Sequence, residues 1–498
     1  MHIYSVIIMG IVKNWCSPKM PESDRLLGLE STSEYRQRWI SIRVIYFTGF
    51  LVYLAFGVVS TMLWPYLKTL DPEAGKIFLT YVFATPAVVQ LVCSPVFGWW
   101  NNHLPSIRLP MLFLIVTFII GHIVYAILQD LPMHRKYMLL FSRALVGLSS
   151  VCCTIYRAYI SSATTVAERT KTTSYLSLAQ TVGLLTGSIL QPIFSLLGEE
   201  GFRVSDLFRL NMYTVVGWFC TILGCINLIL MLPCVFQDCN IAVKEAMKNR
   251  TGIVTKDLWN SVEQKNLPIG LMCVAFSLLM LVYGGFQTLL SPIALDQFGW
   301  TNEESLFYLG ILMTAGALIS CILFLVLDPL CKRFSEIGVL VYGAMLALFL
   351  SQLLMIPVGT KPITAYIDVN STTGCPPTQE WCQSIPPVTK IQFTISYTLL
   401  CIAFSIGTTL SQAVFSKLLG PRPQGTWMAL LTCAGSAARI VGPGSVTAYV
   451  IVGTYWTFGA STVLSGIIFL WMWVYRNRLQ PSKPDSVEEL KVLSSTKQ

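Results

Sequence analysis

Long apolar runs separated by short polar connections recur along nearly the whole chain. A transmembrane helix needs about 20 predominantly apolar residues to cross the roughly 30 Å hydrocarbon core of a bilayer. Twelve runs come close to this length or exceed it, at residues 44–64, 77–98, 109–128, 137–160, 174–197, 211–235, 267–290, 305–327, 337–357, 391–412, 426–448 and 450–475. The pattern therefore predicts an all-α polytopic membrane protein with twelve transmembrane helices.

A polar connection at residues 236–266 divides these spans into two groups of six. The expected organisation is an N-terminal tail (1–43), a six-helix half (44–235), a central loop (236–266), a second six-helix half (267–475) and a C-terminal tail (476–498). Two halves of equal span number are typical of transporters built from repeats.

The composition agrees with a membrane location. The chain is 54% hydrophobic and 12% charged, against about 25% charged residues in soluble proteins. The net charge of +9 comes from basic residues between the spans, so the expected surrounding is the lipid bilayer and no nucleic acid partner is indicated. The sequence holds no zinc-ligand spacing, phosphate-binding loop or nucleophile motif. We therefore expect no enzyme activity, no catalytic residues, no metal site and no cofactor.

The distribution of Lys and Arg predicts the orientation, because short cytoplasmic loops carry an excess of both. With both tails in the cytosol, the cytosolic segments hold 23 Lys and Arg, and the opposite side holds 8. The loop 358–390 then faces the lumen. It contains the glycosylation sequon at Asn370 and the pair Cys375 and Cys382, and glycans and disulfides both form on that side.

The N-terminal tail contains an acidic dileucine pattern formed by Glu22, Leu26 and Leu27. Clathrin adaptors read signals of this type in cytosolic tails and direct proteins to endosomes and lysosomes. The motif is short and can arise by chance, but it lies on the predicted cytosolic side. We expect a multi-pass protein of the lysosomal or endosomal membrane.

Three arginines lie inside the predicted spans: Arg143, Arg157 and Arg439. All 25 Asp and Glu lie outside the span interiors, which argues against proton coupling through an intramembrane carboxylate. A buried guanidinium without a carboxylate partner must find carbonyls, water or an anionic ligand. An ionisable residue at membrane depth is by default a functional-site hypothesis, so we take the three arginines as candidate sites for a small anion substrate.

The spacing of these arginines suggests a series of positive stations across the bilayer. Arg143 and Arg157 are fourteen residues apart, which on a continuous helix places them on one face and ~21 Å apart. Arg439 lies ~18 Å in from the cytosolic end of its span. Alternatives remain open: Arg143 can be a structural lock, Arg157 can extend to the headgroups, and Arg439 can clamp backbone carbonyls.

His122 lies in the luminal half of the third span. With a reference pKa near ~6.5, a histidine can respond to luminal acidity, so His122 is a candidate pH sensor. Hydrogen-bonded packing is the alternative reading of a single histidine in a span.

Residues 170–192 are similar to residues 425–447, and a shift of 255 positions places Gly187 on Gly442. Each copy follows a polar loop and forms the fifth span of its half. Small residues at four-residue spacing, Gly183 and Gly187 in one copy and Ala438 and Gly442 in the other, allow helices to cross closely. The similarity indicates two related halves that enclose a central cavity.

These motifs resemble those of the major facilitator superfamily. The loop motif with Gly98, Asn102 and Arg108, the span-four motif Arg143-x-x-x-Gly147 and the span-five motif Gly183-x-x-x-Gly187 occupy the positions where that superfamily keeps them. The resemblance implies roles in helix packing and gating for these residues and for Gly435, Gly442 and Pro443. Two positions depart from the pattern: Asn102 replaces an Asp, and Ser188 replaces a Pro that Gly442-Pro443 retains.

A lysosomal branch of this superfamily shares further motifs with the chain. They are Tyr35-Arg-x-Arg-Trp39, Trp64-Pro-Tyr-Leu67, Glu168-Arg169-Thr170, Cys375-x6-Cys382, Gly420-Pro-x-Pro-Gln-Gly425 and Ala438-Arg-Ile-x-Gly-Pro443. Membership of this branch implies a lysosomal protein that is glycosylated in the same loop and associated with chloride conductance.

Three functions remain open from the sequence. The first is conduction or transport of small anions such as chloride in endolysosomes. The second is alternating-access transport of a small organic anion or metabolite. The third is a scaffold or sensor that keeps the fold without transport.

The orientation predicts that Asn370 carries a glycan and that Asn249, in the cytosolic central loop, carries none. Asn370→Gln should therefore increase electrophoretic mobility and remove the response to glycosidase, whereas the matched change Asn249→Gln should leave both unchanged. A mobility change in the Asn249 variant alone would contradict the predicted orientation.

Overall fold

The computed structural model describes residues 28–479 except for 29, 75, 105, 132–133, 199–200, 206–207, 234, 250–265, 301, 360–374, 376–378 and 421–423. The described residues of Met1–Gln264 and Leu419–Ala429 form one compact unit, and those of Lys265–Leu418 and Leu430–Gln480 form a second. We call them unit 1 and unit 2 and describe each by itself.

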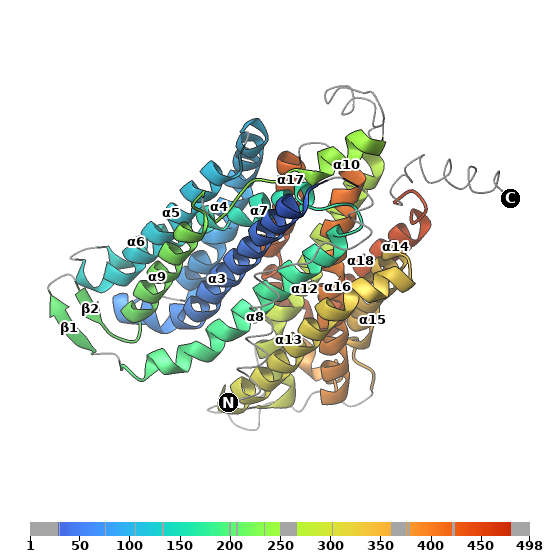
Figure 1. Ribbon diagram of the computed structural model, residues 1–498. Coiled ribbons are helices and arrows are strands. Elements are labelled where there is room, and N and C mark those ends of the chain that lie inside the picture. The colour runs from blue at the N-terminus through green and yellow to red at the C-terminus, as the bar shows by residue number, and fades with distance from the viewer. Residues whose placement is uncertain are drawn as a thin grey trace, which may run out of the picture. The chain divides into compact units, whose positions relative to one another are not determined.

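Unit 1 contains the first six predicted spans (Figure 1). Its helices are α3 (Thr32–Leu70), α4 (Lys76–His103), α5 (Arg108–Ile127), α6 (Arg135–Ser149), α7 (Cys152–Ser162), α8 (Arg169–Ser195), α9 (Thr214–Leu230) and α10 (Ile241–Asn249). A 3-10 turn, Leu128–Asp130, extends α5. A short antiparallel hairpin of β1 (Phe202–Ser205) and β2 (Phe208–Leu210) connects α8 to α9, with Phe202 opposite Leu210.

Unit 2 contains the remaining spans. Its helices are α12 (Asn266–Phe298), α13 (Asn302–Arg333), α14 (Glu336–Gly338), α15 (Leu346–Leu354), α16 (Lys390–Leu419) and α18 (Gly444–Val474), with a π-helical turn at Val339–Met345 and a 3-10 turn at Glu380–Gln383. Helix α17 (Gly425–Val441) begins in unit 1 and continues in unit 2.

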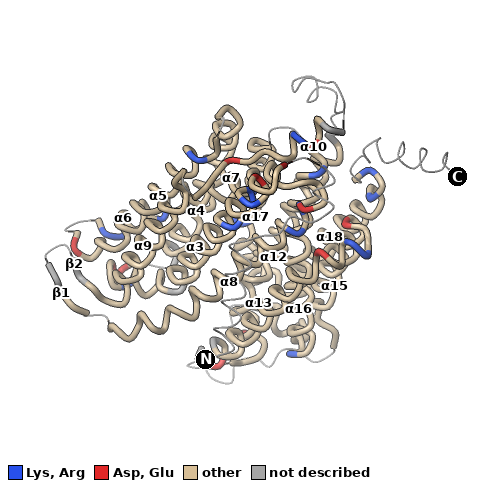
Figure 2. The backbone as a smooth tube through the Cα atoms, in the orientation of Figure 1, with Lys and Arg blue, Asp and Glu red and all other residues tan. Residues whose placement is uncertain are grey.

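Ten helices in the described part of the chain are long and apolar enough to cross a membrane. The apolar helix α9 and the helix α17, each of 17 residues, account for the two other predicted spans. Charged residues gather near the helix ends and in the connections (Figure 2). This distribution is what a bilayer requires, because charges are costly in hydrocarbon.

The first helix begins earlier than the apolar pattern predicts, at Thr32 instead of residue 44. Ser31 caps it: the Ser31 hydroxyl accepts from the Glu34 N–H, and the Glu34 carboxylate accepts from the Ser31 N–H, which is a capping box. Arg38, 1% exposed, donates to Glu30, to Glu168 and to the Ala163 carbonyl. These partners satisfy the charge and allow the helix to extend beyond the apolar run.

The boundary between the last two spans also differs from the prediction. Helix α17 ends at Val441 beside Gly442-Pro443, and α18 contains a non-helical residue, Gly453, with φ 82°. Residues 444–452 therefore continue the eleventh span after a break at the Gly-Pro pair, and the twelfth span begins beyond Gly453. Glycine is suited to this position because it adopts positive φ without steric cost.

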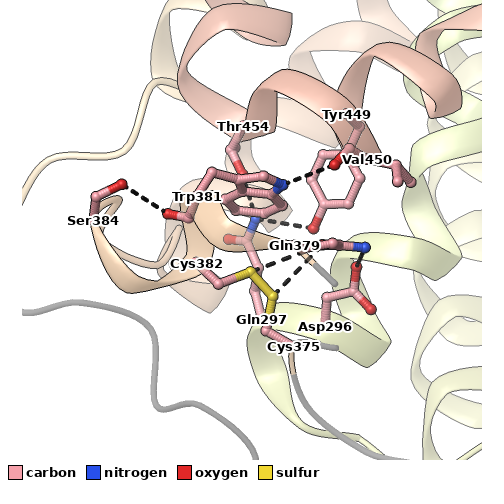
Figure 3. Close-up of a disulfide and its surroundings, with 10 residues drawn as sticks. All are labelled: Asp296, Gln297, Cys375, Gln379, Trp381, Cys382, Ser384, Tyr449, Val450 and Thr454. Atoms are coloured by element: carbon pink, nitrogen blue, oxygen red, sulfur yellow. Dashed lines mark hydrogen bonds between the residues drawn. A yellow bond between two sulfur atoms is a disulfide. The ribbon is translucent and has the colours of Figure 1, made fainter. Parts of the chain in front are cut away.

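A disulfide-closed loop covers this second break (Figure 3). Cys375 and Cys382 form a disulfide. The ring of Trp381, the residue before Cys382, packs on Gly453, where an added Cβ would lie 2.7 Å from the ring. The Trp381 indole N–H donates to the Val450 carbonyl at 3.2 Å. Trp381 therefore binds a backbone carbonyl in the turn that precedes Gly453.

The end of α12 joins the same cluster (Figure 3). The Gln297 amide donates to the Thr454 hydroxyl at 2.6 Å, and its carbonyl oxygen accepts from the Val388 N–H at 2.9 Å. Gln379 donates to the Asp296 carboxylate at 3.5 Å. Polar contacts thus connect the seventh span, the loop and the start of the twelfth span.

The repeat detected in the sequence corresponds to two equivalent helix crossings. In unit 1, Gly183 and Gly187 of α8 pack on α3, where a Cβ on Gly187 would lie 2.8 Å from the Val58 nitrogen. In unit 2, a Cβ on Gly442 would lie 3.3 Å from the Gly285 nitrogen of α12. The fifth span of each half thus crosses the first span of that half at a glycine.

Gly187→Val should destabilise the protein strongly, because the α3 backbone occupies the space of the added side chain. Overpacking of this kind typically costs about 1–3 kcal/mol. The matched control is Gly310→Val on α13, where nothing lies within 4 Å of the added Cβ. Thermal unfolding in detergent, followed by size-exclusion fluorescence, measures both variants. Equal midpoints for the two would contradict a backbone contact at Gly187.

Candidate functional site

A close crossing of α5 and α6 brings His122 and Arg143 together. Gly121 lies at this crossing, where a Cβ would be 3.1 Å from the Leu145 Cβ, and the Ser142 hydroxyl donates to the Gly121 carbonyl at 2.9 Å. His122 and Arg143 follow these two residues in the sequence. A small residue and one hydrogen bond therefore hold α6, which carries Arg143, in register with α5, which carries His122.

Helix α9 closes the third side of this site. Gly217 packs on Ala126 of α5, where a Cβ would approach the Ala126 Cβ to 2.8 Å. Cys220 lies one turn farther along α9 and is fully buried. Tyr125, also fully buried, precedes Ala126 on α5. We call the cluster of His122, Tyr125, Arg143 and Cys220 the Arg143 site.

The Arg143 guanidinium is buried and has unused hydrogen-bond donors. The residue is 4% exposed, and its Nε and Nη2 are buried and make no hydrogen bond among the described residues. Its Cζ lies 5.3 Å from the centre of the Tyr125 ring. Stacking of this kind contributes about 0.5–2 kcal/mol, but each unpaired buried donor costs ~1–3 kcal/mol. The ring therefore does not replace the missing acceptors.

Two other side chains of the Arg143 site, His122 and Tyr125, differ in their hydrogen bonding. His122 Nδ1 lies 2.9 Å from the Phe118 carbonyl oxygen, a geometry in which Nδ1 carries the proton and donates it. Nε2 is then the ring nitrogen that takes no part in this hydrogen bond. The Tyr125 hydroxyl is buried and makes no hydrogen bond among the described residues. The described ionisable groups that act on Arg143 and His122 include no carboxylate.

The fourth span, Arg135–Ser162, tightens locally at Ser150–Val151, between α6 and α7, where the backbone stays in the right-handed helical region. The Ser150 carbonyl accepts from the Cys153 N–H at 3.1 Å and from the Gln90 amide of α4 at 2.9 Å. Gly147 packs on Pro86, where a Cβ would lie 2.6 Å from the Pro86 Cα. The arrangement of Arg143 and Arg157 on one helix face, expected from their spacing, stays a prediction.

Arg157 lies beyond this tight turn, on α7, and is half-buried. Its Nε is buried without a hydrogen-bond partner among the described residues. Neighbouring groups that interact with its charge are Tyr53, Tyr156 and the adjacent Cys152 and Cys153. A role in anion binding remains a prediction.

Arg439 lies in the last turn of α17 and is exposed on the surface of unit 2. Its Nη2 donates to the Ser436 hydroxyl at 3.1 Å. A cation in the last turn is favourable for the helix dipole, and the break at Gly442-Pro443 follows directly. Gly435, one turn before Arg439, packs on Phe276, where a Cβ would lie 2.8 Å from Cε1.

The end of α4 packs on the first turn of α17 within unit 1. The Asn102 carbonyl oxygen accepts from the Gly425 N–H at 2.8 Å, and its amide donates to the Thr426 hydroxyl at 2.8 Å. A Cβ on Gly98 would lie 2.6 Å from the Ala429 Cβ. Asn102 thus caps a helix N-terminus, a position that also favours the Asp it replaces.

Arg108 at the start of α5 donates through Nη2 to the Phe236 carbonyl at 2.7 Å. This contact connects α5 to the segment that follows α9. Four residues assigned from the sequence, Glu22, Leu26, Leu27 and Asn370, lie outside the described residues.

Sequence reasoning did not identify Tyr125, Cys220 and Gln90 as parts of the site. Tyr125 lies one turn beyond His122 on the same helix face, which was a usable signal. Cys220 and Gln90 stand on other helices, and nothing in their local sequence distinguishes them from ordinary core residues.

Two bundles of apolar helices, with glycine crossings on equivalent helix pairs and polar groups inside the spans, define a multi-pass membrane transport protein. The family model of the Major Facilitator Superfamily matches residues 45–375. The chain belongs to this superfamily and has its fold. Members of the superfamily are transporters rather than enzymes.

Comparison with known proteins supports the same assignment. The chain is 32% identical over 484 residues to Major facilitator superfamily domain-containing protein 8 of Xenopus laevis, covering 91% of this chain and 94% of the relative. The structure of the human organic anion transporter MFSD10 (TETRAN) is similar in fold, with a TM-score of 0.61, 15% identity and coverage of 87% of this chain and 99% of that one. The proton:xylose symporter XylE gives a TM-score of 0.62 at 14% identity, with coverage of 92% and 98%.

Proposed function

We propose that this transporter moves small anions across an endolysosomal membrane, with chloride as the first ion to test. The observation that carries the proposal is the Arg143 site, where a buried guanidinium has two N–H donors without acceptors. No carboxylate lies among the described groups that act on it. An anionic ligand supplies both the countercharge and the missing acceptors.

Arg439 gives secondary support. It lies 14 residues from the start of α17, or ~21 Å along the helix, and the spans carry few other charges. Its position in the last helical turn also fits a structural role, in which it stabilises the carbonyls at the Gly442-Pro443 break. The two roles predict different outcomes on substitution.

An alternating-access carrier of a small organic anion or metabolite is the second candidate. The glycine crossings and the breaks at Gly442-Pro443 and Gly453 favour it, because hinges and close helix contacts allow rearrangement of a bundle. A scaffold or sensor without transport has no need of unpaired donors at the Arg143 site. His122 remains a candidate pH sensor for either transport mode.

The intracellular location rests on the acidic dileucine pattern of the N-terminal tail and on the resemblance to a lysosomal branch. Both tails face the cytosol in this proposal, in agreement with the distribution of Lys and Arg. Clathrin adaptors are then the expected partners of the tail.

Arg439→Gln should lower chloride flux per folded molecule about tenfold if Arg439 attracts the anion, and Arg439→Lys should retain more of the flux because it keeps a point charge. The measurement is flux in proteoliposomes, normalised to the folded, monodisperse fraction. Lys332→Gln, an exposed change at the end of α13, is the matched control and should leave flux unchanged. Normal flux in well-folded Arg439→Gln would assign Arg439 to the structural role.

Replacing Leu26 and Leu27 together by Ala should move the protein from endolysosomes to the cell surface, since the adaptor can no longer bind the pair. Surface biotinylation, compared with Leu29→Ala as a control outside the motif, gives the readout. Unchanged endolysosomal retention in the double variant means that another signal directs the protein.

A further inference from the structure

The two unused donors of Arg143 are a particular pair. Nε–H and Nη2–H lie along one edge of the planar guanidinium and point in nearly parallel directions. This edge matches two oxygens of one carboxylate and forms two parallel hydrogen bonds with them. A single spherical ion between the two N–H groups accepts both at bent angles, whereas the two carboxylate oxygens accept each along its own direction.

The stacking geometry leaves this edge available. The Arg143 Cζ lies over the Tyr125 ring, 5.3 Å from its centre, and this contact leaves Nε and Nη2 without a hydrogen-bond acceptor among the described residues. Both atoms are buried, so bulk water does not satisfy them. The Tyr125 hydroxyl, a third buried donor without an acceptor, belongs to the same ring.

The charge of the site limits the charge of its ligand. Among the described groups, Arg143 contributes one positive charge, and its neighbours Tyr125 and Cys220 are neutral in their ordinary forms. The surrounding side chains are aromatic and buried: Tyr66 lies 4.8 Å from Tyr125 and 5.0 Å from Tyr213, centre to centre. A doubly charged anion such as sulfate would leave one charge uncompensated in these surroundings.

We infer that the Arg143 site binds a monovalent carboxylate, held by the Nε–Nη2 edge of Arg143, so that the substrate class is a small carboxylate-bearing anion rather than a halide. This inference rests on the proposed function for its link to transport, but the binding itself does not require transport. His122 contributes specificity in this arrangement. With Nδ1 engaged by the Phe118 carbonyl, its Nε2 is the ring atom that remains for a hydroxyl or a carboxylate oxygen of the ligand.

The binding test uses purified full-length protein in nanodiscs and follows the unfolding midpoint at constant pH and ionic strength. The probes are sodium acetate, sodium L-lactate, sodium chloride and sodium sulfate. Acetate and lactate should raise the midpoint with saturation, while chloride and sulfate at the same concentrations should not. Equal stabilisation by all four salts, or by none, overturns the inference and leaves water as the partner of Arg143.

Variants then test the geometry. Arg143→Lys keeps the charge but loses the planar edge, so carboxylate affinity should fall at least tenfold. Tyr125→Phe removes one hydroxyl without changing the ring stack and should lower affinity about three- to tenfold. Arg135→Lys is the matched control, because Arg135 lies on the same helix and donates from Nε to the Leu131 carbonyl at 2.8 Å. If Arg143→Lys does not fold, two measurements still test the inference: the preference of the unmodified protein for acetate and lactate over chloride and sulfate, and the carboxylate affinity of Tyr125→Phe.

Flux measurements separate this inference from the proposed function. Carboxylate binding without uptake of labelled acetate, lactate or chloride supports the site and contradicts transport of small anions. Chloride flux without carboxylate binding supports anion transport and contradicts the carboxylate site. Carboxylate uptake that Arg143→Lys reduces, while Arg135→Lys does not, supports both.

Discussion

A guanidinium inside an apolar protein must have acceptors for its N–H groups, and this requirement distinguishes two arginines of unit 1. Arg38 is 1% exposed and is paired with two carboxylates and a backbone carbonyl. Arg143 is 4% exposed and has two buried donors without acceptors among the described residues. Removing a charge from water is costly in both cases. The chain supplies the countercharge for Arg38, which makes it structural, and the absence of one at Arg143 makes that residue the better candidate for a ligand.

Glycine contacts determine where these side chains lie. Gly121 and Gly217 bring α6 and α9 against α5, and the residues of the Arg143 site follow these contacts by one to a few positions. Gly187 and Gly442 perform the corresponding function on the fifth span of each half. In a bilayer the hydrophobic effect does not drive helices together, so close van der Waals packing at small residues contributes much of the association. The same contacts therefore define the fold and position the site.

Breaks in the spans are the second recurring device. The Ser150 carbonyl, at the tight turn between α6 and α7, accepts from Gln90 as well as from the Cys153 N–H, and the Val450 carbonyl beside Gly453 accepts from Trp381. Backbone groups at membrane depth must be satisfied inside the protein, so each break requires a partner from another element. One partner comes from α4 and the other from the disulfide-closed loop. A bundle with broken helices keeps its hydrogen bonds and still has positions at which a helix can change direction.

The sequence alone determined the number of spans, the division into two groups of six and the membership of the superfamily. These follow from local properties: run length, hydropathy and short motifs at Gly98, Arg143 and Gly183. It also made Arg143 and His122 candidates, because a charged or titratable residue in an apolar run is visible without a structure. Only the tertiary structure decided which donors of Arg143 remain unpaired among the described residues, that Tyr125 and Cys220 join it, and that Gln90 binds the Ser150 carbonyl of the fourth span. The physical reason is that hydrogen-bond satisfaction depends on which residues of other helices meet a side chain. Those meetings are set by crossings between segments that lie tens to hundreds of positions apart in the chain.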